Sequence, residues 1–115
     1  MKEKIRKAIA AHGAWKDRLR TAIASGKLEV PIANIRADNV CDFGKWLHGE
    51  EAVLGRESRY AKVKDLHARF HRAAGEVAEL ALAGKKADAE VAMAGDYAAV
   101  SATLTNEMTD WEASL

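Results

Sequence analysis

Hydrophobic residues recur along this chain at the three- and four-residue steps that are typical of amphipathic helices. The first such segment spans about residues 2–25, and its apolar stripe also contains one histidine. The stripe consists of Ile5, Ile9, His12, Trp15, Leu19 and Ile23. Ser25 and Gly26 follow the last apolar position, so we expect the first helix to end there.

The second segment follows a stretch without helical periodicity. Residues 26–37 contain the only proline of the chain, and we interpret them as a crossing loop of about a dozen residues, which is long for a compact domain. Asp38 is a favourable N-cap, and it predicts a short helix that runs to about His48 and places Cys41 in its first turn. The expected inner face of this helix comprises Val40, Phe43 and Leu47.

The third and fourth segments are longer. After a polar connection over residues 49–58, a third helix is predicted to carry the stripe Tyr60, Val63, His67, Phe70, Ala74, Val77 and Ala81. A fourth helix is predicted from about Asp88 to the end of the chain, with the stripe Met93, Tyr97, Val100, Leu104, Met108, Trp111 and Leu115. The pattern therefore predicts an all-α four-helix bundle with three long helices and one short helix that carries the cysteine.

The composition narrows the class of protein. The chain has 115 residues, of which 49% are hydrophobic, and this favours one folded domain over residues 1–115 rather than a disordered chain. Charged residues make up 30% and leave no apolar run of the roughly 18 residues that a membrane span needs. The formal net charge of +1 gives no electrostatic reason to expect nucleic acid or an anionic membrane as the partner. We therefore expect a soluble protein without membrane insertion.

The charges are unevenly distributed along the chain. Residues 1–72 contain 16 Lys and Arg against 9 Asp and Glu, whereas residues 73–115 contain 2 against 8. We expect these oppositely charged segments to pack against each other in antiparallel orientation. The alternative is that one of them forms an acidic or basic docking face.

Cys41 is the only cysteine, so it cannot form a disulfide within the chain. The N-terminal segment is heavily charged and contains no apolar signal sequence, which favours a reducing, cytoplasmic location. Backbone N–H groups and the helix dipole at the start of a helix favour the thiolate, which is the form that binds zinc. The alternative is that Cys41 only fills space in the core.

Three of the four histidines are placed where a metal ion could use them. His67 and His71 are four residues apart and therefore share one helix face. His12 lies on the apolar stripe of the first helix, where an imidazole needs a partner, which can also be a hydrogen bond within the core. Together with Cys41, these residues form a complete set of one cysteine and three histidines for tetrahedral zinc. His48, at the end of the short helix, is expected to contact free backbone carbonyls instead.

Other residues are candidates for supporting such a site. Gly44 is interpreted as a close-approach residue that lets the short helix bring Cys41 to the metal, with an ordinary helix glycine as the alternative. The expected apolar shell consists of Trp15, Phe43, Trp46 and Phe70. Candidate carboxylate acceptors for the imidazole N–H groups are Asp38, Asp42 and Asp65.

Three motifs, taken in order, carry a family resemblance. They are His12-Gly-Ala-Trp15, Cys41-Asp-Phe-Gly44-Lys-Trp46 and His67-Ala-Arg-Phe-His71, with 25 residues between the first two and 20 between the last two. This pattern resembles the chemoreceptor zinc-binding (CZB) domain of bacterial signalling proteins over about residues 5–110. The resemblance implies a four-helix bundle that binds one zinc ion through His12, Cys41, His67 and His71.

The resemblance also implies a function. It implies a domain that is often dimeric, that is usually attached to a cytoplasmic chemoreceptor or a diguanylate cyclase, and that senses zinc or oxidants such as hypochlorous acid through the zinc-bound cysteine. We therefore expect a zinc-binding sensory domain that modulates chemotaxis or cyclic-di-GMP signalling. Its stimulus would be either zinc occupancy or oxidation of Cys41 to sulfenic acid.

Other function classes fit the sequence less well. No enzymatic turnover is expected, because a filled coordination sphere leaves no position for water and no His-Glu-x-x-His motif supplies a base. A di-iron carboxylate bundle is disfavoured, because no histidine has a glutamate three positions before it. The main alternative is a metal-free bundle in which the alanine-rich fourth helix mediates dimerisation. The wide apolar faces of three long helices favour a homodimer in either case.

Overall fold

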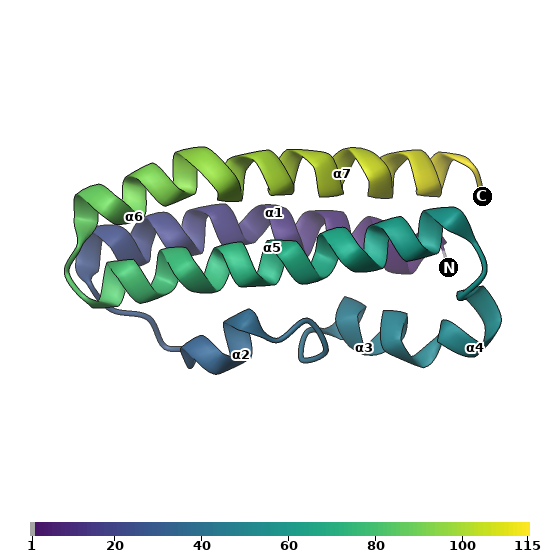
Figure 1. Cartoon of the computed structure of the whole chain (residues 1–115), viewed down its shortest axis with the longest axis horizontal. Coiled ribbons are helices and arrows are strands. Elements are labelled where there is room, and N and C mark those ends of the chain that lie inside the picture. The colour runs from purple at the N-terminus through teal and green to yellow at the C-terminus, as the bar shows by residue number, and fades with distance from the viewer. Residues whose placement is uncertain (1) are drawn as a thin grey trace.

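Three long helices run alongside one another through the length of the molecule (Figure 1). The computed structural model describes residues 2–115, which form a rod of 43 × 22 × 20 Å. The long helices are α1 (Lys2–Ser25), α5 (Ser58–Leu82) and α7 (Ala98–Ala113), and all three pack on one another. α1 and α5 run in one direction and α7 in the opposite one. No helix in the described residues combines the length and the apolar character that a membrane span requires.

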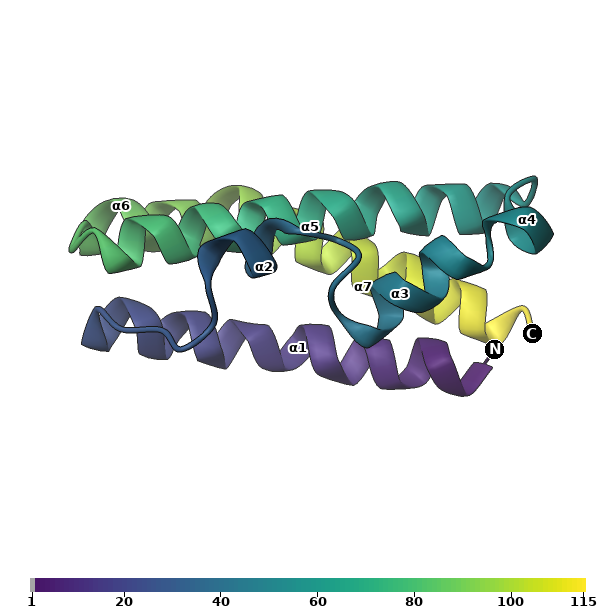
Figure 2. The same cartoon turned by 90° about the horizontal axis from the view of Figure 1, so that it is seen from below.

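The segment that connects α1 to α5 forms the fourth side of the bundle. It contains α2 (Ile32–Arg36), α3 (Asp42–Gly49) and α4 (Glu51–Leu54), and it lies over α1 and α5 on the side away from α7 (Figure 2). Tyr60 in α5 holds this segment by donating a hydrogen bond from its hydroxyl to the backbone carbonyl of Leu47 in α3. The predicted all-α four-helix bundle is therefore confirmed, with a broken fourth side.

Two short helices lie where the hydrophobic pattern predicts none. α2 falls within the predicted loop over residues 26–37, and α4 falls within the predicted connection over residues 49–58. Each is about one turn long, too short to show the periodicity on which the prediction depends. α2 begins after Pro31, whose carbonyl accepts hydrogen bonds from the N–H groups of Asn34 and Ile35 and whose fixed φ suits the start of a helix.

The prediction of Asp38 as the N-cap of the short helix is wrong. The N-cap is Cys41, whose Sγ accepts a hydrogen bond from the N–H of Gly44 at 3.3 Å. The Asp38 carboxylate contacts His48 instead. Because α3 begins later than expected, Val40 lies before the helix and is 43% exposed rather than part of its inner face.

The fourth predicted helix is interrupted. It begins as α6 (Lys86–Ala92), passes through one π-helical turn, η1 (Met93–Tyr97), and continues as α7. Gly95 marks the interruption, because its φ of −94° and ψ of −107° lie outside the helical region. The predicted stripe is buried except for Val100, which is half-buried, and Leu115, which lies beyond the end of α7 and is 50% exposed.

The predicted apolar stripes otherwise face the core. On α5 every predicted position from Tyr60 to Ala81 is buried. On α1 the stripe is buried except for Ile9 and Trp15, which are half-buried. On α7, Val100 is also half-buried. The core is therefore continuous along the three long helices, and the face that α1 and α5 turn toward α3 contains their histidines.

Ion pairs join the basic and acidic parts of the chain. Arg6 in α1 lies 2.8 Å from Glu112 in α7, and Lys62 in α5 lies 2.9 Å from Glu107 in α7. These contacts confirm the expected antiparallel packing of oppositely charged segments. Because both cations are largely exposed, the pairs favour the arrangement without contributing much to its stability.

Candidate metal centre

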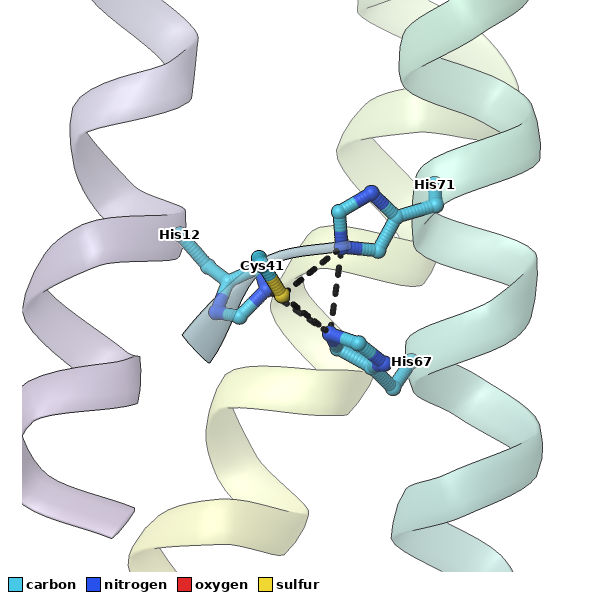
Figure 3. A group of neighbouring side chains, drawn as sticks. All are labelled: His12, Cys41, His67 and His71. Carbon is cyan, nitrogen blue, oxygen red and sulfur yellow. Dashed lines mark hydrogen bonds between the residues drawn. The ribbon is translucent and has the colours of Figure 1, made fainter. Parts of the chain in front are cut away.

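Four side chains that are distant in the sequence meet in the middle of the bundle (Figure 3). His12 comes from α1, Cys41 from the start of α3, and His67 and His71 from successive turns of α5. One donor atom from each of the four lies within 4.8 Å of all the others. The structure thus brings together all the side chains that the sequence motifs single out.

The spacing of the donor atoms fits a tetrahedral ion. The Nε2 of His67 lies 3.0 Å from that of His12 and 3.1 Å from that of His71. The Sγ of Cys41 lies 3.4 Å and 3.6 Å from the Nε2 atoms of His67 and His71. Zinc bonds of about 2.0–2.1 Å to nitrogen and about 2.3 Å to sulfur separate tetrahedral donors by about 3.3 Å between nitrogens and about 3.6 Å between nitrogen and sulfur. The residues present therefore fit zinc with little rearrangement.

Backbone carbonyls orient two of the three imidazoles. The Nδ1 of His12 donates to the carbonyl of Ala8 at 2.7 Å, and the Nδ1 of His71 donates to the carbonyl of Ile35 in α2 at 2.8 Å. Because a carbonyl only accepts, these rings carry their proton on Nδ1, and Nε2 directs a lone pair into the cluster. His67 differs, since its Nδ1 is buried without a hydrogen-bond partner in the described part of the chain.

The carboxylates considered as acceptors for these N–H groups are engaged elsewhere or exposed. Asp38 contacts His48 at 3.2 Å, Asp65 pairs with Arg69 at 3.0 Å within α5, and Asp42 is exposed. His48 therefore lies outside the cluster, but it contacts a carboxylate rather than the free backbone carbonyls that we expected. Sequence reasoning misses the true acceptors because every residue has a backbone carbonyl, so no residue type signals one.

Burial keeps the three imidazoles neutral. His12, His67 and His71 are 4%, 0% and 3% exposed. Loss of hydration lowers the pKa of His12 to about 4 and the pKa of His67 to about 2, and it also lowers the pKa of His71. Because a neutral imidazole is the form that binds a metal ion, these rings are ready to bind one at neutral pH.

Cys41 is the one member of the cluster that is not buried. Partial burial raises the pKa of its thiol, whereas the hydrogen bond from the Gly44 N–H lowers it, and burial is the larger effect. The start of α3 favours the thiolate as expected, but in the metal-free protein burial outweighs this effect. A coordinated cation removes the proton of a thiol, so metal binding would restore the thiolate.

Gly44 lets the backbone segment just before Cys41 lie close against α3. A Cβ atom at this position would lie 1.8 Å from the backbone oxygen of Asp38 and 3.2 Å from the Cα of Asn39. Only glycine allows this contact, because the obstacle is backbone rather than the end of a flexible side chain. The close-approach interpretation is therefore confirmed, with the segment directly before Cys41 as the neighbour.

Two phenylalanine rings enclose the cluster. Phe43 contacts the ring of His67 with 5.3 Å between ring centroids, and Phe70 lies 5.0 Å from His12 and 5.5 Å from His71. All three are edge-on contacts of buried rings. They exclude water from the donors, which strengthens electrostatic interactions with a bound cation.

The two tryptophans of the expected shell have different positions. Trp46 stacks on Phe43 at 5.7 Å and contacts Trp111 of α7 at 6.0 Å, so it supports the shell from outside. Trp15 lies half-buried beneath the guanidinium of Arg18, which is 3.9 Å from the ring centroid. Trp15 also packs against the edge of the core, and its place in the shell stays a prediction.

Comparison with known families gives one match. Residues 12–78 match the family described as the chemoreceptor zinc-binding domain. The matched range covers more than half of the 115 residues and includes His12, Cys41, His67 and His71. Searches of curated proteins and of solved structures gave no match. The family match and the geometry agree, because imidazole nitrogen and cysteine sulfur are preferred ligands of zinc.

Substitution of Gly44 tests the contact that positions Cys41. In Gly44→Ala the new methyl group overlaps the backbone of Asp38, so we expect the free energy of unfolding to fall by about 1–3 kcal/mol. Urea unfolding followed by circular dichroism measures it. The matched control is Gly13→Ala in α1, where a Cβ meets nothing within 4 Å and should stabilise the helix by about 0.5–1 kcal/mol. Equal effects of the two substitutions would contradict the close contact.

Proposed function

This zinc-binding chain belongs to the chemoreceptor zinc-binding domain family, and from that premise we propose that His12, Cys41, His67 and His71 hold one zinc ion. The observation that carries the proposal is the convergence of three neutral imidazole nitrogens and one sulfur at tetrahedral spacing. When bound, zinc supplies a divalent charge and coordinate bonds to all four side chains. The ligands belong to three separate elements, α1, α3 and α5, which meet at this point of the fold.

We further propose that the site is regulatory and not catalytic. Four protein donors complete a tetrahedral coordination sphere and leave no position for a water nucleophile. The three histidines are buried among aromatic rings, which leaves no room for a substrate beside them. What changes with occupancy is how firmly α1, α3 and α5 are held together, and this difference in stability is the signal that an output can read.

The proposed stimulus includes an oxidant of the hypochlorous acid type. Cys41 is the only unburied member of the cluster, and its sulfur is the donor that oxidants attack. Hypochlorous acid would transfer its oxygen to the Cys41 thiolate: an S–O bond forms, the O–Cl bond breaks, chloride leaves, and the sulfur loses two electrons to become a sulfenic acid. The oxidised sulfur is a weaker ligand, so α3 is held less firmly against α1 and α5. A change in zinc concentration acts on the same site by filling or emptying it.

The proposed setting is a homodimer in the bacterial cytoplasm that modulates a linked or docked signalling output, either chemotaxis or cyclic-di-GMP metabolism. Residues 1–115 are proposed to form one domain of this kind. Support for the homodimer comes from α7, where Ala98, Ala99 and Ala102 are exposed. Small side chains let a second helix approach closely, because the distance between helix axes depends on the side chains at the contact.

Removal of a ligand is expected to weaken zinc binding. We expect the wild type to bind one zinc per chain, and Cys41→Ala and His67→Ala to bind it at least about 100-fold more weakly, since even residues behind the ligands contribute 10–100-fold. Metal analysis gives the stoichiometry, and competition with a chromogenic chelator gives the affinity.

The matched control for these variants is His48→Ala. His48 is the remaining histidine of the chain, and it lies at the end of α3 in contact with Asp38 rather than in the cluster. This variant should retain one zinc with the affinity of the wild type. Well under one zinc per wild-type chain after exposure to zinc, or unchanged binding in Cys41→Ala and His67→Ala, would refute the proposal.

Oxidation of Cys41 is expected to release zinc. During titration of the zinc-loaded protein with hypochlorous acid, zinc release should follow the formation of sulfenic acid at Cys41, because one ligand is weakened for each sulfur oxidised. A zinc-sensitive dye and mass spectrometry after dimedone labelling measure the two quantities. Met93→Leu controls for methionine oxidation and should release zinc like the wild type. Complete oxidation of Cys41 without zinc release would exclude the oxidant branch and leave zinc level as the stimulus.

A further inference from the structure

One face of α5 carries a row of functional positions at four-residue steps. His67 and His71 are followed on the same face by Gly75 and Glu79. Gly75 is buried, and a Cβ atom there would lie 2.3 Å from the Cγ of Arg36. The stem of the Arg36 side chain therefore lies directly against the backbone of α5, one turn beyond His71.

The far end of Arg36 is fixed as well. Its Nη2 donates to the Oε2 of Glu79, one turn further along the same face. Both side chains are about half exposed, so an ion pair of this kind alone contributes little. The contact of the Arg36 side chain with the backbone at Gly75 adds to the ion pair. It depends on glycine, because a larger residue at position 75 would exclude the stem of Arg36. We call this contact of Arg36, Gly75 and Glu79 the Arg36 clamp.

The clamp sits next to the carbonyl that orients His71. Arg36 is the last residue of α2, so the carbonyl of Ile35 lies in the last turn, where no further helical N–H reaches it. That carbonyl accepts the hydrogen bond from the Nδ1 of His71 at 2.8 Å. The Ile35 side chain is buried, which anchors the same residue in the core.

The three imidazoles differ in how they are oriented. His12 donates to Ala8 of its own helix, so its orientation follows from α1 alone. His67 has no Nδ1 partner in the described part of the chain. His71 depends on a separate segment, since its acceptor belongs to α2. The orientation of the His71 ring is therefore sensitive to where α2 lies on α5.

We propose that the Arg36 clamp seats α2 on α5 so that the Ile35 carbonyl directs the Nε2 of His71 toward Cys41 and His67. Arg36 is thus a positioning residue for the zinc site, and this role rests on the proposed function. Only five residues separate Ile35 from Cys41, so the same clamp limits where the chain can place the sulfur. The Arg36 clamp thus helps to position two of the four ligands, His71 and Cys41.

The test compares three clamp variants with a matched control. Arg36→Ala removes the clamp, Gly75→Ala blocks the contact of the Arg36 stem with the backbone of α5, and Arg36→Lys keeps the stem and the charge. The control is Lys62→Ala, which removes a cation of α5 that pairs with a glutamate of α7 at 2.9 Å. The two readouts are zinc affinity from chelator competition and proton exchange at the His71 Nδ1 by nuclear magnetic resonance of metal-free, ¹⁵N-histidine-labelled protein. The Nδ1 proton of His12 is the internal reference.

We expect about 10-fold weaker zinc binding in Arg36→Ala and Gly75→Ala, the lower end of what residues behind a ligand contribute. The His71 Nδ1 proton should exchange at least about 10-fold faster in both, while that of His12 is unchanged. Arg36→Lys should retain most of the wild-type zinc affinity and most of the slow exchange at His71. Lys62→Ala should change neither the zinc affinity nor the exchange rate. A general loss of stability would instead speed exchange at His12 and His71 alike, and that result would overturn the proposal.

Failure of the clamp and failure of the zinc assignment give different results. If the wild type binds one zinc but Arg36→Ala changes neither the affinity nor the exchange at His71, the clamp is refuted and the zinc site stands. If the wild type binds no zinc, the proposed function is refuted, and the clamp loses its role at a metal site whatever the exchange rates show.

Discussion

The fold depends on placing three imidazoles and one thiol inside a small helical bundle. A buried polar group is costly unless it has a partner, and Ala8 and Ile35 supply backbone partners for only two of the ring nitrogens. The three Nε2 atoms and the Cys41 sulfur face one another, so the elements that carry them must meet. α1 and α5 lie side by side with their histidines facing, and the crossing segment lies over them to deliver Cys41.

The site is asymmetric, and the proposed sensing function depends on this asymmetry. The three histidines are buried, neutral and enclosed by phenylalanine rings, so they form the stable part of the cluster. Cys41 belongs to a short helix on the least regular side of the bundle and is partly exposed. Loss of this one ligand would remove one of the contacts that hold α3, while Phe43, Leu47 and the three long helices keep their shared core. A chemical event at one sulfur can therefore change the mobility of a whole segment.

The sequence predicts what depends on side-chain periodicity. The stripes of α1 and α5 place His12 and His67 on inward faces, and His71 shares the face of His67 because it lies four residues further along α5. Backbone contacts cannot be predicted in this way. The carbonyl that orients His71 belongs to Ile35 in α2, which is too short to show a hydrophobic periodicity. Trp15 lies on the same α1 stripe as His12 but is only half-buried, so stripe position alone does not decide how deeply a residue is buried. Side-chain pattern thus identifies the donors, and main-chain geometry decides how they are held.

In the proposed site, one sulfur and three imidazole nitrogens surround a single zinc ion. X-ray absorption at the zinc edge of the zinc-loaded protein measures this directly, because it gives the type, number and distance of the ligand atoms. The predicted spectrum fits one sulfur at about 2.3 Å and three nitrogens at about 2.0–2.1 Å. A spectrum without a zinc–sulfur distance, or one that requires six oxygen and nitrogen ligands, would refute this coordination.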